Sequence, residues 1–165
     1  MNMEEKLSVL VVDDESVMRS SLSEWLGDEG FTVRTAESGP KALELLDEEV
    51  ANVAIVDIKM PEMDGITLLK KIREKGIDMP IIMLTAYATI ESAIQSMKEG
   101  AYDYLMKPFP PEKLTLLIRR TVEHQRLTKE NLRLQSERKT FLRLAFGVIV
   151  VIAVIGVIYY FIFAP

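Results

Sequence analysis

Short runs of apolar, mostly β-branched residues alternate with longer amphipathic stretches through the first three quarters of this 165-residue chain. This alternation is typical of βαβ units, in which helices cover both faces of a parallel sheet. We predict strands at 8–12, 32–36, 53–56, 81–84 and 104–106. Predicted helices occupy 17–28, 40–48, 66–75 and 89–98, and a fifth begins after Pro111. We therefore expect an α/β fold whose strands are each buried on both faces.

Polar groups suited to chemistry follow four of these strands. They are Asp13 and Asp14 after the first strand, Asp57 after the third, Thr85 after the fourth and Lys107 after the fifth. Ligands of an open parallel sheet bind at the carboxyl ends of its strands, so we expect these groups to share one edge. Three carboxylates in one place repel each other and require a cation, and an all-oxygen set of ligands suits Mg²⁺.

The same groups are suited to phosphoryl transfer. A metal ion and a lysine neutralise the charge on phosphoryl oxygens, and a hydroxyl donates to one of them. Aspartate can itself be the nucleophile and form an aspartyl phosphate. Asp57 is the isolated acid, whereas Asp13 and Asp14 form a pair suited to holding metal. The sequence contains no GxxxxGK loop, so ATP is not expected as the direct donor.

Four segments resemble the receiver domain of bacterial response regulators in their order and spacing. They are VVDDE, IVDIKMPEMDG around Asp57, LTAY and YLMKPF. The resemblance covers residues 6–122 and implies a flavodoxin-like, doubly wound, five-stranded parallel sheet in the order 2-1-3-4-5. More narrowly, residues 85–109 are similar to receivers of nitrogen-regulator-type enhancer-binding activators.

The resemblance implies a role for each residue at the predicted edge. Asp57 would accept a phosphoryl group from the phosphohistidine of a sensor histidine kinase or phosphotransfer protein. Lys107 would contact the phosphoryl oxygens. Mg²⁺ would be held by Asp14, by Asp57 and by the backbone carbonyl of Lys59, and Asp13 would reach it mainly through water.

The resemblance also implies a switch. Thr85 would turn its hydroxyl toward the phosphoryl group, and Tyr104 would change rotamer in step. This would alter the face made by the fourth helix, fifth strand and fifth helix. The peptide bond preceding Pro108 would be cis. Lys59 and Tyr87 lie where the family tunes hydrolysis of the aspartyl phosphate.

The implied function is a non-enzymatic switch that signals to an unidentified protein partner and at most slowly loses its own phosphoryl group. Activators of the nitrogen-regulator type continue into an ATPase domain and a helix-turn-helix, for which this sequence leaves no length, so we expect no nucleic-acid binding. Two alternatives stay open. One is a membrane scaffold or binding module that acts independently of phosphorylation, and the less favoured one is a phosphatase that uses the same aspartate.

Residues 123–143 form a basic neck after the acidic receiver. Residues 122–143 carry six Lys/Arg against three Asp/Glu, whereas residues 1–121 carry 14 against 22. The neck contains neither glycine nor proline, so we expect the fifth helix to run on through it. Leu127, Leu134 and Phe141 recur every seven residues with Asn131 between them, which is typical of a short coiled-coil seam and a homodimer. His124 and Arg138 occupy the other seam positions, so a solvated helix is the equally favoured alternative.

Residues 144–165 contain no charged residue. As a helix this segment would span about 33 Å, close to the ~30 Å hydrocarbon core of a bilayer. We therefore predict a transmembrane helix at 144–164, with a buried core segment as the alternative. The neck places six basic residues before this span and none follows it, so we expect a single-pass protein of the bacterial inner membrane with its receiver in the cytoplasm.

Overall fold

The computed structural model describes residues 6–86 and 89–135. The chain divides into two compact units, Met1–Glu123 and His124–Pro165. The first unit contains the strands β1 (Ser8–Val12), β2 (Thr32–Ala36), β3 (Val53–Asp57), β4 (Ile81–Thr85) and β5 (Asp103–Met106). Its helices are α1 (Ser16–Asp28), α2 (Gly39–Glu48), α3 (Gly65–Glu74) and α4 (Ile90–Lys98), and residues 111–123 are helical too. The bounds lie within one residue of those predicted.

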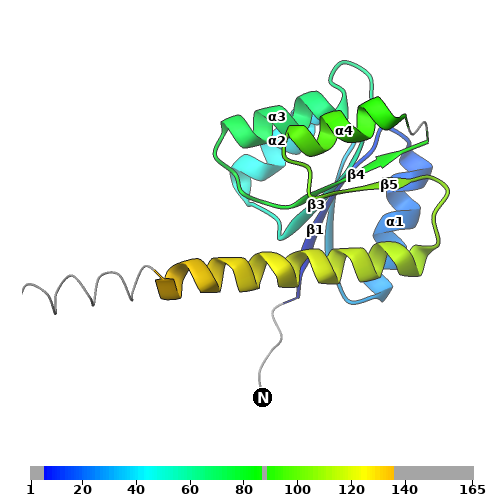
Figure 1. The fold of residues 1–165 in the computed structure, drawn as a ribbon. Helices are drawn as coiled ribbons and strands as arrows, with labels where there is room; N and C mark the ends of the chain where they lie inside the picture. The colour runs from blue at the N-terminus through cyan, green and yellow to red at the C-terminus, as the bar shows by residue number, and fades with distance from the viewer. Residues whose placement is uncertain (1–5, 87–88, 136–165) are drawn as a thin grey trace, which may run out of the picture. The chain divides into compact units, whose positions relative to one another are not determined.

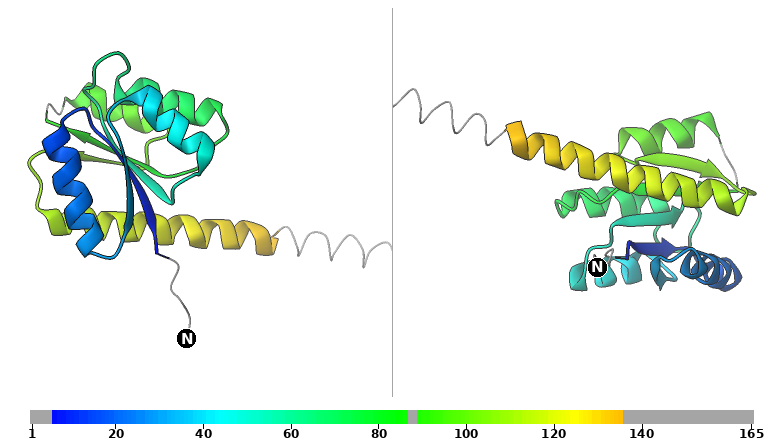
Figure 2. Two further views of the ribbon diagram at one scale, coloured as in Figure 1. Left: turned by 180° about the vertical axis from the view of Figure 1, so that it is seen from behind. Right: turned by 90° about the horizontal axis from the view of Figure 1, so that it is seen from below.

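The strands form one parallel sheet in the order β2-β1-β3-β4-β5, which confirms the predicted topology. Helices α2, α3 and α4 cover one face of the sheet, and α1 and residues 111–123 cover the other (Figures 1 and 2). The alternation within β1 shows how both faces are filled. Leu10 and Val12 pack on the α2 and α3 side, and Val9 and Val11 pack on the α1 side.

Burial on both faces holds only for the central strands. Residues of β3 and β4 are buried throughout, and β1 is buried at all positions except Ser8. The prediction is wrong for β2, where Thr32 and Thr35 are exposed, and for β5, where Met106 is exposed. These two strands lie at the edges of the sheet, where each has a neighbour on one side only and the covering helices leave its outer side chains in water.

The second unit is described only from residue 124 to residue 135, all of it helical. The rest of the predicted neck and the predicted membrane span at 144–164 lie outside the described residues. Leu127 and Leu134 of the predicted seam are 50% and 56% exposed. Over residues 6–86 and 89–135, no helix combines the length and the apolar character needed to cross a membrane.

Candidate functional site

Two carboxylates meet where the central strands end. Asp13 directly follows β1 and Asp57 is the last residue of β3. These strands pair in register, with Val12 opposite Val56, so their carboxyl ends lie side by side. Asp13 is 1% exposed and Asp57 6% exposed. Ionised carboxylates are seldom buried without a partner, so this pair requires a positive charge.

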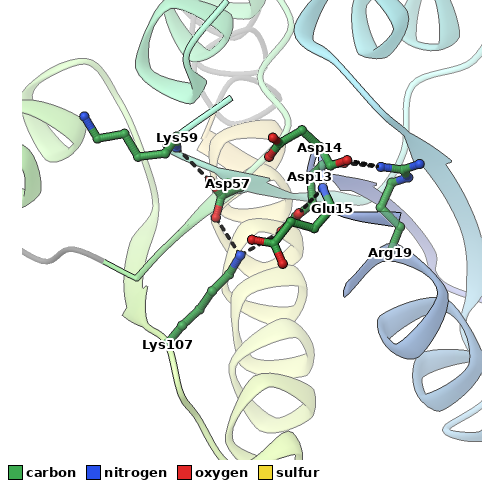
Figure 3. A network of polar contacts seen from close by, with 7 residues as sticks. All are labelled: Asp13, Asp14, Glu15, Arg19, Asp57, Lys59 and Lys107. Atoms are coloured by element: carbon green, nitrogen blue, oxygen red, sulfur yellow. Dashed lines mark hydrogen bonds and ion pairs between the residues drawn. The ribbon is translucent and has the colours of Figure 1, made fainter. Parts of the chain in front are cut away.

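Lys107 supplies that charge. Its Nζ lies 2.7 Å from Asp13 Oδ2 and 2.6 Å from Asp57 Oδ1 (Figure 3). Lys107 follows β5, and its backbone N–H donates to the carbonyl of Thr85 at 2.7 Å. This bond holds the main chain of Lys107 against the end of β4. The sheet thus brings together three of the predicted site residues, from strand ends separated by up to 94 positions in the chain.

Burial and pairing act in opposite directions on the pKa values of Asp57 and Lys107. Burial raises the pKa of the Asp57 carboxyl, and the hydrogen bond and charge of Lys107 offset this only in part, so the net direction is upward. For Lys107, burial lowers the pKa, but the hydrogen bonds and charges of Asp13 and Asp57 outweigh it, so the net direction is upward. The ammonium therefore remains charged between its partners.

Main-chain donors orient both carboxylates. Asp57 Oδ2 accepts a 2.7 Å hydrogen bond from the backbone N–H of Lys59, and Asp13 Oδ1 accepts one of 2.9 Å from the backbone N–H of Glu15. Each buried carboxylate thus has one oxygen on the lysine and the other on the chain two residues further on. The side chain of Lys59 takes no part in these bonds and is exposed.

A glycine that sequence reasoning missed allows this geometry. Gly65 begins α3, and a Cβ there would overlap the main-chain oxygen of Asp57 and lie 3.0 Å from Ile58 Cα. Its N–H donates to the carbonyl of Ile58 at 2.9 Å. Asp64 caps the helix, because its Oδ1 accepts a 2.7 Å hydrogen bond from the backbone N–H of Thr67. The aspartate–glycine pair before a helical run was the available signal, since only glycine permits so close an approach of two backbones.

The other predicted residues lie around this cluster. Asp14 is exposed, and its side chain forms none of the hydrogen bonds in Figure 3. Thr85 is 1% exposed at the end of β4. The Lys107–Pro108 peptide bond is cis. Tyr87 lies outside the described residues.

Tyr104 is half-buried on β5 and contacts helix α4. Its hydroxyl lies 3.3 Å from Ser92 Oγ. Ser92 belongs to the capping box of α4, in which its backbone N–H donates to Thr89 Oγ1 at 3.1 Å and its hydroxyl is 3.3 Å from the backbone N–H of Thr89. The predicted switch tyrosine is therefore bonded to the group that begins α4, a contact the sequence did not indicate.

The donor set fits Mg²⁺ in its chemistry. Two buried carboxylates share one ammonium, which leaves one negative charge unbalanced, and carboxylate and carbonyl oxygens are the ligands that Mg²⁺ prefers. Among the residues that the structure describes, no group of three or more aspartate, glutamate, histidine or cysteine side chains lies close enough together to hold a metal ion. The metal site therefore stays a prediction.

Arg19 is the second residue that sequence reasoning missed. Its Nη1 donates to the main-chain carbonyls of Asp13 at 2.7 Å and Asp14 at 2.9 Å (Figure 3). It also lines an open groove of about 480 Å³ along α1. The residues that line this groove do not include Asp13, Asp14, Asp57 or Lys107. Bonds to main-chain atoms leave no pattern of residue types, which is why the sequence did not reveal this one.

Comparison with known proteins agrees with the fold. A family model described as the response regulator receiver domain matches residues 9–119. The regulatory protein AtoC of Escherichia coli strain K12 is 40% identical over 122 residues, 74% of this chain and 26% of that protein. The chain spans about a quarter of the length of the curated relatives it matches.

Solved structures give the same result. A receiver domain protein from Methanospirillum hungatei JF-1 has a TM-score of 0.72 at 33% identity, over 75% of this chain and 99% of that chain. NtrX from Brucella abortus has a TM-score of 0.74 at 32% identity, over 79% of this chain and 30% of that chain. Because the family model covers more than half of its residues, this chain belongs to the response regulator receiver domain family, whose members act in phosphorylation-based two-component signalling.

Proposed function

We propose that this chain is a phosphoacceptor switch in which Asp57 takes a phosphoryl group from a phosphohistidine on a sensor histidine kinase or phosphotransfer protein. The observation that carries the proposal is the Asp13–Lys107–Asp57 cluster, which holds a buried carboxylate and an ammonium 2.6 Å apart at a strand end. An ammonium so placed can offset negative charge that gathers on a phosphoryl group at Asp57.

In the proposed transfer, a carboxylate oxygen of Asp57 attacks phosphorus. An oxygen–phosphorus bond forms, the nitrogen–phosphorus bond of phosphohistidine breaks, and the released imidazole keeps the electron pair and takes up a proton. The backbone N–H of Lys59 orients the attacking carboxylate. Lys107 then exchanges its contact with the carboxylate for one with the phosphoryl oxygens. Mg²⁺, when bound, would neutralise charge on these oxygens.

Residues that would hold this metal ion lie at the ends of β1 and β3. They are the carboxylates of Asp13, Asp14 and Asp57 and the backbone carbonyl of Lys59. The unbalanced negative charge of the buried pair supports the assignment. We propose that Lys59, whose side chain is exposed beside the acceptor, and Tyr87 set the rate at which water hydrolyses the aspartyl phosphate.

The signal would leave through α4 and β5. Thr85 would turn toward the phosphoryl group, and Tyr104 would leave its contact with Ser92. This face already carries exposed apolar side chains. Ile90, Ile94 and Met97 of α4 are 76%, 49% and 50% exposed, and Met106 of β5 is 56% exposed. Exposed apolar residues at helical spacing support docking of a downstream protein here.

Phosphorylation of Asp57 can be tested directly. The full chain is incubated with Mg²⁺ and a small acyl phosphate, and intact mass is measured. We expect a gain of one phosphoryl group that is lost in Asp57→Asn and kept in Asp47→Asn, because Asp47 lies on the surface, where it pairs with Lys75. A gain that persists in Asp57→Asn contradicts the assignment, and no gain in the wild-type chain favours the phosphorylation-independent scaffold.

We also propose that the apolar segment at 144–164 anchors the chain in the bacterial inner membrane, with the receiver in the cytoplasm. The support is the sequence. Residues 144–165 carry no charge and follow six basic residues, which favour the cytoplasmic side.

The neck supports a homodimer. Leu127 and Leu134 are half-exposed on a helix, seven residues apart, and Asn131 between them suits a two-stranded parallel seam. We expect Leu134→Ser to shift the full chain toward monomer in sedimentation. Leu132→Ser is the matched control, because Leu132 is similarly exposed at 61% but lies off the seam. Equal effects of the two substitutions would argue for a solvated helix.

A further inference from the structure

Arg19 reaches the acidic cluster without touching a carboxylate of the cluster. It is the fourth residue of α1, and its Nη1 bridges the main-chain carbonyls of Asp13 and Asp14 at 2.7 and 2.9 Å. Its side chain is 16% exposed, and its other terminal nitrogen, Nη2, lies 3.9 Å from Oε2 of the exposed Glu37. The arginine therefore joins the first helix to the loop that carries both acids.

The choice of main-chain acceptors has a chemical consequence. A guanidinium that bonded the carboxylates would occupy oxygens that a divalent cation needs. Bonded to carbonyls, it places a positive charge beside Asp13 and Asp14, weakens the repulsion between the acids, and itself occupies none of their carboxylate oxygens. It also fixes the direction in which the loop leaves β1.

The loop geometry shows what this achieves. Asp13 Oδ1 accepts from the backbone N–H of Glu15 at 2.9 Å, and Asp13 Oδ2 accepts from Lys107 at 2.7 Å. Both bonds require one orientation of the Asp13 main chain. The carbonyl of the same residue is held by Arg19. Release of that carbonyl would let the peptide between the two acids rotate.

We propose that Arg19 is a positioning residue for the acidic pair: its guanidinium holds the carbonyls of Asp13 and Asp14, so that Asp13 faces Lys107 and the pair stays open to a divalent cation. The proposal deepens the proposed function of Asp57 and rests on it. It assigns to α1 a part in the phosphoacceptor site.

Two substitutions of Arg19 in the full chain test the proposal, and the first measurement needs no metal. Residue-resolved hydrogen exchange reports the Glu15 amide, whose bond to Asp13 depends on the held loop. In Arg19→Met we expect this amide to exchange about tenfold faster, as the loss of one hydrogen bond's restraint predicts. Arg19→Lys keeps the charge but lacks the planar fork, so we expect an intermediate rate.

Arg34→Met is the matched control. Arg34 also donates to two main-chain carbonyls, those of Leu45 and Glu49, and its side chain is 23% exposed, but it lies on β2 away from the acids. We expect its substitution to leave the Glu15 amide unchanged. If Arg19→Met leaves the exchange rate of Glu15 at the wild-type value, or if Arg34→Met raises it equally, Arg19 does not position the pair.

Direct Mg²⁺ binding by calorimetry is the second measurement. We expect Arg19→Met to weaken the affinity severalfold and Arg34→Met to leave it unchanged. A wild-type chain that binds no Mg²⁺ contradicts the metal part of the proposed function, whereas the exchange of Glu15 decides the role of Arg19 in either case. If the wild-type chain and Arg19→Met bind Mg²⁺ with equal affinity, the bonds from Arg19 to the carbonyls of Asp13 and Asp14 do not contribute to cation binding.

Discussion

Single residues at the site act through close approach and through main-chain bonds. Asp57 is held by one side-chain cation and one backbone N–H, and both contacts depend on how tightly the loop after β3 returns to α3. That return is tightest at Gly65, where a side chain would overlap the backbone of the acceptor. The position of Asp57 therefore depends on residue 65 having no Cβ atom.

Gly65→Ala tests this dependence. Relieving the overlap must move the start of α3 away from β3, so we expect a loss of stability of about 1–3 kcal/mol and slower phosphorylation of Asp57. The measurements are chemical denaturation and the rate of mass gain with an acyl phosphate.

Gly27→Ala is the control, because among the described residues no atom beyond its two chain neighbours and the backbone of its own helix lies within 4 Å of a Cβ built there. It should stabilise α1 by about 0.4–1 kcal/mol and leave the phosphorylation rate unchanged. A Gly65→Ala protein as stable and as reactive as wild type would show that α3 can shift without moving Asp57.

The contact between Tyr104 and Ser92 can be measured by a double-mutant cycle. We expect Tyr104→Phe and Ser92→Ala to show a coupling energy of about 0.5–1.5 kcal/mol in the unphosphorylated chain, since one hydroxyl contact joins them at 3.3 Å. Ser96→Ala replaces Ser92→Ala in the control cycle, because the hydroxyl of Ser96 bonds the Ser92 carbonyl instead. A coupling energy of zero would mean that Tyr104 and the start of α4 move independently.

At the scale of elements, the site residues gather at the carboxyl edge of the sheet, and the helices pack on its two faces. Residues 111–123 are held by Leu114 and Ile118, both fully buried against the α1 side of the sheet. A surface contact adds to this. The guanidinium of Arg119 lies 4.9 Å from the ring centre of Phe31 and donates to the carbonyl of Glu29 at 2.9 Å.

Arg119→Ala measures the strength of that contact. The cation–π contact and one charged hydrogen bond are lost, but the side chain is 54% exposed, so we expect the unfolding free energy to fall by only about 1 kcal/mol. The neighbouring Arg120 is also exposed, and Arg120→Ala should change the unfolding free energy by less than about 0.5 kcal/mol. Equal losses in chemical denaturation would assign the effect to helix propensity or net charge.

At the scale of the whole molecule, the folding of the receiver and the membrane binding of the C-terminal segment can be tested separately. The receiver has two apolar clusters within the first unit, and among residues 6–86 and 89–135 neither of them includes a position beyond 122. It should therefore keep its fold without the proposed anchor.

Deletion of residues 144–165 tests both statements. We expect the truncated chain to move from the membrane fraction to the soluble fraction and to keep the Asp57-dependent mass gain. A full-length variant with Val151→Asp and Val154→Asp should also leave the membrane, since each charge disfavours insertion by about 2.5–3.5 kcal/mol. Truncated protein that still sediments with membranes would show that another part of the chain binds them.

The sequence by itself determined the periodic order of strands and helices and which chemical groups follow each strand. Residues adjacent in the chain set these features, and the bounds of each element were predicted to within one residue. The meeting of Asp13, Asp57 and Lys107 was also predictable, because parallel strands end at one edge. Exposure of β2 and β5 was missed, although the predicted order 2-1-3-4-5 places both strands at the edges of the sheet, where outer side chains stay in water.

Only the tertiary structure decided how these groups are held. Arg19 bonds main-chain oxygens, Gly65 acts through the absence of a Cβ, and Ser92 meets Tyr104 across two elements. The contacts of Arg19 and Ser92 leave no pattern of residue types along the chain, and the aspartate–glycine pair at 64–65 marks a helix start without showing how closely Gly65 approaches Asp57. Each depends on distances between backbones that form only when the sheet and its helices are assembled, so the sequence could indicate which groups meet at the site but not what holds them in place.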